Sequence, residues 1–355
     1  MTNQAAILRP FDDPAFDLNG KSILITGGTG SFGKAFLQTI IDNFAPRRVI
    51  IFSRDEFKQH ELSLRYPENE YPFLRFFIGD VRDAQRLEMA MRSVDYVVHA
   101  AAMKQVGASE YNPFECIRTN VIGAENVIRA AMRAGVKQVI ALSTDKATNP
   151  VNLYGASKLA SDKIFIAGNY MSGSAGTRFS VVRYGNVVGS RGSVVEVFKR
   201  MIEDDVESLP ITDDRMTRFW ITLPQATNFV LSCFAMMAGG EIFVPKIPSM
   251  SVLDLAAAMA PDIKTHTIGI RPSEKLHETM IPLDDNRETY EFTDRFIMES
   301  QLDLPIPSIA ERFGNRATQV PMDFAYTSDL NTEWLDIETL RTLLHSMGQM
   351  PEMAN

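Results

Sequence analysis

Lys21-Ser-Ile-Leu-Ile-Thr-Gly27-Gly-Thr-Gly30-Ser-Phe-Gly33 is the stretch of sequence that decides the fold. A short apolar run ends in three glycines at three-residue intervals, and a segment with helical spacing of apolar residues follows. Glycines at a strand-to-helix turn let the backbone approach a pyrophosphate closely, and the free N–H groups of the helix start point at it. This context predicts a dinucleotide-binding loop; a plain tight turn is the alternative.

Outward from this loop, short apolar runs alternate with longer helical patterns as far as about Tyr184. Most of these runs are apolar throughout, which is typical of parallel strands covered on both faces by helices. We therefore predict an α/β fold, a Rossmann-type doubly wound parallel sheet with a smaller C-terminal substrate-binding lobe. The expected strands are 22–26, 48–53, 74–78, 96–100, 138–143 and 179–184, and helical spacing is found within 36–41, 121–131, 223–237, 252–259 and 337–347.

The expected domain organisation has three parts. Residues 1–185 form the dinucleotide-binding domain with the catalytic residues, 186–300 the smaller lobe that binds the substrate, and 301–355 a C-terminal extension. We leave open that a later strand returns to the first sheet. The turn-rich sequence after Gly185 places the first boundary there.

Composition excludes several functional classes. The chain has 355 residues, with 36 Lys and Arg against 44 Asp and Glu, and a formal charge of −8. A net acidic chain has no general attraction for nucleic acid or anionic lipid, so we expect neither as a partner. No apolar run is long enough to span a membrane, and two cysteines argue against a disulfide framework, so we expect a cytoplasmic protein.

No metal site is expected. The five histidines lack the spacing of metal ligands, and the segment 275–278, which contains His277, is interpreted as the surface of a helix.

The end of the second strand indicates which dinucleotide binds. Ser53-Arg54-Asp55-Glu56-Phe57-Lys58 offers a hydroxyl and two cations, which suit a ribose 2′-phosphate and predict NADP rather than NAD. Asp80, after the third strand, is placed either to accept from the adenine amine or to cap a helix. The predicted cofactor-binding residues are Gly27, Thr29, Gly30, Ser31, Phe32, Gly33, Ser53, Arg54, Lys58, Asp80, Val81, Ala100, Tyr154 and Lys158.

Two polar motifs near the end of the fifth strand predict redox chemistry. Tyr154 and Lys158 are four residues apart and therefore share one helix face. The lysine charge lowers the pKa of the phenol, so that Tyr154 can take the proton of an alcohol as it is oxidised. Thr144 would hydrogen-bond the same hydroxyl. A chance Tyr/Lys pair is the alternative, which the preceding dinucleotide loop disfavours.

Asp145 and Lys146 go beyond what a simple dehydrogenase needs. An acid and a base side by side at the substrate face favour an elimination after the oxidation, because a C4 ketone acidifies the C5 proton of a sugar. A surface ion pair is the alternative reading.

Several longer motifs are similar to those of the configuration-inverting UDP-N-acetylglucosamine 4,6-dehydratases, in the extended short-chain dehydrogenase/reductase superfamily. The resemblance covers about 18–280 and, more thinly, 324–335. It implies NADP as cofactor, UDP-N-acetylglucosamine as substrate, a homo-oligomer, and the first step toward pseudaminic acid, a sugar placed on bacterial flagellins. The motifs are Ser143-Thr-Asp-Lys-Ala147, Asn149-Pro, Asn152-Leu-Tyr-Gly-Ala156, Arg183-Tyr-Gly-Asn-Val-Val-Gly-Ser-Arg-Gly-Ser193 and Met216-Thr-Arg-Phe-Trp-Ile-Thr222.

The resemblance also implies residue roles. Lys146 is the base that removes the C5 proton, and Asp145 the acid that protonates the leaving C6 hydroxyl. Retaining relatives have Asp-Glu where this chain has Asp145-Lys146, so the pair implies inversion. The catalytic set is Thr144, Asp145, Lys146, Tyr154 and Lys158, and the substrate contacts are Lys104, Asn186, Arg191, Arg218, Arg271 and Glu274. Gly107, Glu196 and Ser273 depart from the family pattern outside the catalytic set.

Three alternatives remain at this stage. Two are enzymes on the same fold, a retaining 4,6-dehydratase and a nucleotide-sugar C4-epimerase or reductase. The third is a regulatory module that senses NADP without catalysis, which the intact Tyr154 and Lys158 disfavour. Fold alone cannot separate these functions.

Overall fold

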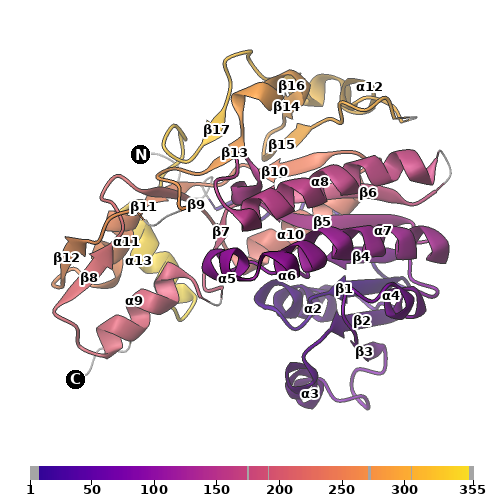
Figure 1. Ribbon diagram of the computed structural model, residues 1–355, viewed down its shortest axis with the longest axis horizontal. Helices are drawn as coiled ribbons and strands as arrows, with labels where there is room; N and C mark the ends of the chain where they lie inside the picture. Colours follow the sequence, from indigo (N-terminus) through magenta and orange to yellow (C-terminus); the bar gives the residue numbers. More distant parts are fainter. Residues whose placement is uncertain (1–7, 174–175, 191, 271–272, 305, 352–355) are drawn as a thin grey trace.

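The computed structural model describes residues 8–173, 176–190, 192–270, 273–304 and 306–351, and a sheet of ten strands forms its centre (Figure 1). Seven neighbouring strands run parallel, and three antiparallel strands extend the sheet beyond them. The strand order is β16 (Thr318–Gln319), β14 (Thr289–Glu291), β15 (Arg295–Met298), β10 (Ile242–Pro245), β6 (Arg178–Tyr184), β5 (Gln138–Thr144), β4 (Tyr96–His99), β1 (Ser22–Thr26), β2 (Arg48–Ser53) and β3 (Leu74–Ile78).

Helices cover both faces of the parallel strands. Helices α4 (Ala84–Ala90), α7 (Gly123–Ala134) and α8 (Leu153–Ser172) pack together on one face, and α2 (Ser31–Asn43) and α10 (Leu223–Met236) pack together on the other (Figure 1). Every residue of β1 is buried, as expected for a strand between two helical layers. The predicted α/β fold with a doubly wound parallel sheet is therefore confirmed, and the six expected strands agree with the structure to within one residue at each end.

The first crossovers carry shorter elements. Helix α3 (Glu56–Arg65) joins β2 to β3, and α5 (Val106–Tyr111), α6 (Pro113–Ile117) and the π-helical turn η1 (Arg118–Ile122) precede α7. The apolar stripe of α7 faces the core, and Gly135 ends the helix with φ of 69°, a left-handed conformation that suits glycine.

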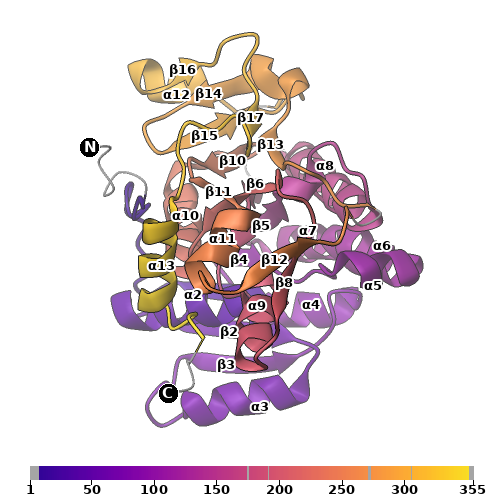
Figure 2. The same ribbon diagram turned by 90° about the vertical axis from the view of Figure 1, so that its left-hand side faces the viewer.

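A second, smaller core lies beside the carboxyl ends of the parallel strands. It contains two small sheets, β11 (Ser249–Ser251) with β9 (Thr217–Ile221) and β7 (Asn186–Val187), and β12 (Lys264–Thr267) with β8 (Ser208–Ile211). Three helices complete it, namely α9 (Val194–Glu203), α11 (Val252–Met259) and α13 (Ile337–Ser346). Figure 2, in which the left-hand side of Figure 1 faces the viewer, shows these three helices in front of the large sheet.

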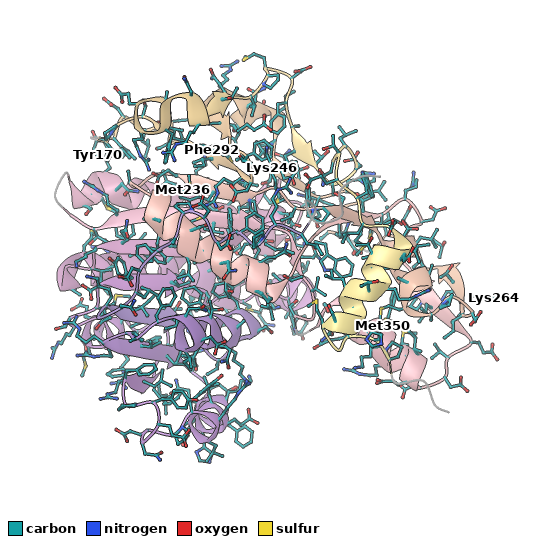
Figure 3. The ribbon with its side chains drawn as sticks, turned by 180° about the vertical axis from the view of Figure 1, so that it is seen from behind. Tyr170, Met236, Lys246, Lys264, Phe292 and Met350 are labelled. Atoms are coloured by element: carbon teal, nitrogen blue, oxygen red, sulfur yellow. The ribbon has the colours of Figure 1, made fainter. Side chains whose placement is uncertain are left out.

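The two cores do not follow the expected boundaries at residues 185 and 300. Helix α10 and strands β10, β14 and β15 lie between these positions, yet they belong to the large sheet or cover it. Conversely α13, expected in a separate extension, packs on α11 in the small lobe, and Figure 3 shows Met350 there, far from Phe292. The chain crosses between the cores because strand pairing and helix packing are long-range, whereas the expected boundaries rest on local turn composition.

The remaining elements connect these parts. They are β13 (Thr279–Ile281) paired with β17 (Tyr326–Thr327), the helix α12 (Ile309–Phe313), and the short turns η2 (Asp145–Ala147), η3 (Leu283–Glu288) and η4 (Gly314–Arg316). Within the described ranges, no helix is both long enough and apolar enough to cross a membrane.

Candidate active site

A cleft of about 510 Å³ opens where the parallel strands β1, β2, β4, β5 and β6 end. Ligands of open α/β sheets bind at this edge, because the loops after the strands converge there. All predicted cofactor residues line the cleft, and so do four of the five predicted catalytic residues, which are Thr144, Lys146, Tyr154 and Lys158. Of the predicted substrate contacts, Lys104 and Asn186 are in its wall.

The loop after β1 needs its glycines for close backbone contact. Gly27 has a φ of 66°, and a Cβ there would lie 2.8 Å from the backbone nitrogen of Ala101. A Cβ on Gly33 would lie 2.5 Å from the Cα of Gly28. Gly30 caps the N-terminus of α2, whose first turn carries no acidic side chain. The loop therefore presents a bare, positively polarised helix start that fits a pyrophosphate.

The end of β2 places two cations at the rim of this cleft. Asp55 caps α3 by accepting from the backbone N–H of Lys58 at 3.0 Å, and its carboxylate lies 2.5 Å from the Lys58 ammonium. The Arg54 side chain is 60% exposed, with its guanidinium 3.6 Å from the Asp80 carboxylate. Asp55 is thus committed to its own helix, while Arg54 remains accessible to a ligand.

Asp80 does not cap a helix, because Asp83 caps α4 by accepting from the N–H of Arg86. The Asp80 carboxylate instead accepts from the backbone N–H of Arg82 at 2.9 Å and from its guanidinium at 2.6 Å. Burial alone would raise the pKa of this carboxyl, but the hydrogen bonds from Arg82 outweigh it and lower the pKa below its ordinary value. Of the two readings offered for Asp80, the helix cap is therefore wrong.

Helix α8 brings Tyr154 and Lys158 to the cleft. It starts after Asn152, whose side chain accepts from the N–H of Gly155 at 2.7 Å, so both functional residues fall in its first two turns. The Lys158 ammonium donates to the carbonyl of Leu142 at 2.7 Å. Burial lowers the pKa of Lys158, and the nearby charge of Asp162 opposes this.

Burial makes the Tyr154 hydroxyl a weaker acid than a free phenol. Burial raises its pKa to about 12, although the charge of Lys146 and a hydrogen bond with Thr144 act in the opposite direction. Taking a proton from an alcohol therefore requires positive charge beyond that of Lys146, which Lys158 and a bound cationic ligand can supply.

Asp145 and Lys146 lie in η2, directly after β5. The Lys146 ammonium donates to Asp145 Oδ1 at 3.0 Å, and the Thr144 hydroxyl donates to the same oxygen at 2.9 Å. Asp145 is completely buried, and its Oδ2 has no hydrogen-bond partner within the described part of the chain. The alternative of a surface ion pair is therefore excluded.

A second carboxylate, Glu278, completes this cluster and was missed in the sequence. Its Oε1 lies 3.1 Å from the Lys146 ammonium, and its side chain is only 2% exposed. Burial by itself would lower the pKa of Lys146, but the charges of Asp145 and Glu278 outweigh it and raise the pKa well above its ordinary value. Residues 275–278 also form no helix, contrary to expectation.

The predicted substrate residues divide into three groups. Lys104 lies in the cleft wall, and partial desolvation there lowers its pKa against the opposing charge of Glu196. Arg218 and Glu274 lie 3.5 Å apart in the small lobe, where Arg218 also approaches Glu278. Arg191 and Arg271 lie outside the described residues.

Comparison with known proteins shows which family this chain resembles. Residues 23–300 match the family described as polysaccharide biosynthesis protein. The inverting UDP-N-acetylglucosamine 4,6-dehydratase of Campylobacter jejuni is 54% identical over 93% of this chain and 99% of its own length. The UDP-glucose 4-epimerase of Rickettsia canadensis is 40% identical over 94% and 97%. The X-ray structure of Pen from Bacillus thuringiensis is similar with a TM-score of 0.85 at 36% identity, covering 94% of this chain and 99% of that one.

Proposed function

Because this chain belongs to the polysaccharide biosynthesis protein family, and within it to the inverting UDP-N-acetylglucosamine 4,6-dehydratases, we propose that it removes water from UDP-N-acetylglucosamine and inverts C5. The product would be UDP-2-acetamido-2,6-dideoxy-β-L-arabino-hex-4-ulose. The observation that carries this proposal is the ammonium of Lys146, which lines the same cleft as Tyr154 and Lys158 and lies 3.0 Å from the buried Asp145 carboxyl.

The residues of the cleft fit a nicotinamide dinucleotide. The glycine loop after β1 can make its tight turn because a Cβ at Gly27 or Gly33 would collide with neighbouring backbone, and this turn brings the free N–H groups of the helix start to where a pyrophosphate would bind. Ser53, Arg54 and Lys58 would hold the 2′-phosphate of NADP, and the other predicted cofactor residues complete the lining. When bound, the dinucleotide supplies the oxidant for C4 and the reductant for C6 within one turnover.

Three residues act at the C4 hydroxyl. Tyr154 accepts the hydroxyl proton while C4 is oxidised, and Thr144 hydrogen-bonds the same group. Lys158 lies one helical turn further along α8, where its charge favours the ionised phenol. Oxidoreductases and dehydratases of this fold both use these residues. They therefore indicate oxidation at C4 but do not decide which product is formed.

Asp145 and Lys146 together carry the elimination. In the resting site Lys146 carries the proton and donates it in a hydrogen bond to Asp145 Oδ1. Its transfer to Asp145 creates a neutral amine and a carboxylic acid in one step. The amine then takes the C5 proton, Asp145 gives its proton to the departing C6 oxygen, and water leaves. The pair ends with the proton it began with, so the cycle closes. Inversion requires that C5 be reprotonated from the opposite face by a proton from solvent, and Tyr154 returns the C4 hydroxyl proton to solvent, so that all protons balance.

Charged residues would hold the nucleotide diphosphate of the substrate. Lys104 and Asn186 line the cleft, and Arg218 and Glu274, which lie outside its lining in the small lobe, would be further contacts. Local cations of this kind offset the net acidic charge of the chain. We propose the same roles for Arg191 and Arg271 from the family resemblance.

We further propose a cytoplasmic homo-oligomer that opens the pseudaminic acid pathway. Support for self-association comes from Tyr111 and Phe114, which are 87% and 77% exposed on α5 and α6. A monomeric mass in light scattering would contradict that assembly.

Incubation with UDP-N-acetylglucosamine tests the function. We expect a product lighter by one water in mass spectrometry, with no net consumption of the dinucleotide. A C4-epimerase would leave the substrate mass unchanged, a reductase would consume reduced dinucleotide, and a regulatory module would produce no turnover. Any of these three results would overturn the proposal.

Replacing Arg54 with alanine tests the cofactor preference. We expect the affinity for NADP to fall about tenfold or more, because a charge-assisted contact to the 2′-phosphate is lost, while NAD binding changes little. Dissociation constants measured by calorimetry on the apo-protein check this. Arg65→Ala, at the far end of α3, is the matched control. Equal losses for both dinucleotides would contradict the assignment.

A further inference from the structure

Glu278 is held in place by its backbone, independently of its side chain. Its N–H donates to the Ser328 hydroxyl at 2.9 Å, and the N–H of Ser328 donates to its carbonyl at 2.8 Å. These contacts fix the residue immediately before β13, next to the pairing with β17. The side chain then points into the buried cluster around Lys146, on the opposite side from solvent.

Three cations surround this carboxylate. Lys146 Nζ is nearest, at 3.1 Å from Oε1, Arg218 Nε lies 3.9 Å from the same oxygen, and Lys275 Nζ lies 3.8 Å from Oε2. The other titratable groups of the cluster are Asp145 and Tyr154 on the side of η2 and α8, and Glu274 beside Arg218.

Two of these cations have other acceptors. Arg218 donates to the carbonyls of Thr217, Leu276 and Lys275, and it also faces Glu274. Lys275 donates to the carbonyl of Thr148 at 2.5 Å. Lys146 has no carbonyl partner of this kind among the described residues; its ammonium is held by Asp145 and Glu278. Lys146 therefore depends on the Glu278 carboxylate as an ion-pair partner more than Arg218 or Lys275 does.

We propose that Glu278 is a positioning residue for the elimination: it holds the Lys146 amine beside Asp145 and stabilises the ammonium that forms when the C5 proton arrives. This inference rests on the proposed dehydratase function. Glu278 neither gains nor loses a proton in the cycle, since the proton moves between Lys146, Asp145 and the substrate. Its effect is electrostatic, and it is strengthened because the carboxylates of Glu278 and Asp145 are both buried.

The charge of Glu278 also has a pH consequence. The Lys146–Asp145 pair must keep one proton in order to supply the acid, and activity is lost when alkaline solution removes that proton. A neighbouring negative charge raises the pKa for this loss, so removing the charge must shift the alkaline fall of activity to lower pH. Replacing a residue that only supports the fold would not move this alkaline limb of the pH–activity profile.

Glu278→Gln tests the proposal, because it keeps the shape and removes the charge. The rate of water loss is expected to fall about ten- to a hundredfold, and the alkaline limb of the kcat profile to move by about one pH unit to lower pH. With substrate deuterated at C5, the primary isotope effect on kcat should increase, because proton abstraction at C5 becomes more rate-limiting.

Two further variants separate positioning from general damage. Glu274→Gln, the matched control, removes a second carboxylate beside Arg218 and should raise KM while leaving the alkaline limb in place. Glu278→Asp restores the charge but holds it one methylene farther from Lys146, so its alkaline limb should lie between that of Glu278→Gln and that of the unmodified protein. Thermal unfolding and dinucleotide affinity identify the variants that fold. If Glu278→Gln does not fold, the position of the alkaline limb of kcat in Glu278→Asp is compared with its position in Glu274→Gln, and this comparison tests the role of Glu278.

The outcomes of the inference and of the proposed function are distinct. If the unmodified protein removes no water from UDP-N-acetylglucosamine, the function itself fails. If it does so, and folded Glu278→Gln keeps its rate, isotope effect and alkaline limb, then only the role of Glu278 is overturned. If Glu278→Gln does not fold and Glu278→Asp shifts the limb no differently from Glu274→Gln, the role is likewise rejected.

Discussion

The Tyr154→Phe variant is expected to turn over UDP-N-acetylglucosamine about a thousandfold more slowly than the unmodified protein, within the range of general-base catalysis. The change removes one hydroxyl and keeps the ring, so the buried packing at the start of α8 stays intact. Without that hydroxyl, no group is left to accept the C4 proton as the sugar is oxidised. Formation of the dehydrated product, measured by mass spectrometry at saturating substrate, checks the rate.

Tyr184→Phe is the matched control for this variant. Tyr184 is another buried tyrosine in the wall of the same cleft, and burial also raises its pKa, but the account gives it no role at C4. Its loss should change turnover only a few-fold. If Tyr154→Phe keeps most of the activity, or if both variants lose it equally, the base at C4 is a different group.

The Lys146→Met variant is expected to lose dehydration by about two to four orders of magnitude while C4 oxidation continues. Methionine has nearly the length of lysine but cannot accept the C5 proton. In a single turnover with a loaded enzyme, reduced dinucleotide should therefore accumulate, followed by absorbance, and the unmodified protein should show no such accumulation.

Lys104→Met provides the comparison for this second variant. Lys104 lines the cleft but is not a partner of Asp145, so its replacement should raise KM and leave the oxidation and elimination steps coupled. Dehydration by folded Lys146→Met at an unchanged rate would remove Lys146 from the mechanism. Loss of C4 oxidation together with dehydration would show that the substitution damages the whole site.

The parallel part of the fold could be predicted because its signals are local. Strands β1, β2, β4 and β5 are short, mostly buried runs rich in apolar residues, and the glycines after β1 allow few conformations other than the observed turn. The antiparallel extension could not be predicted in the same way. Strands β14 and β16 are only three and two residues long, and β16 pairs with a strand that is distant in the sequence, so their composition carries little information.

The candidate site was predictable to the extent that its residues are neighbours in the chain. Asp145 and Lys146 are adjacent, and Tyr154 and Lys158 share a helix face, so spacing alone groups them. Glu278 reaches the same cluster only through the pairing of β13 with β17. The segment that carries it has helical spacing but forms no helix, because tertiary pairing outweighs a weak local pattern.

Turnover in D₂O, with NMR of the product at C5, tests most directly whether an amine removes the C5 proton and the carbon is then reprotonated from the other face. The account predicts one deuterium at C5 and the L-arabino configuration. A product that retains protium at C5, or that has the D-xylo configuration, would contradict it.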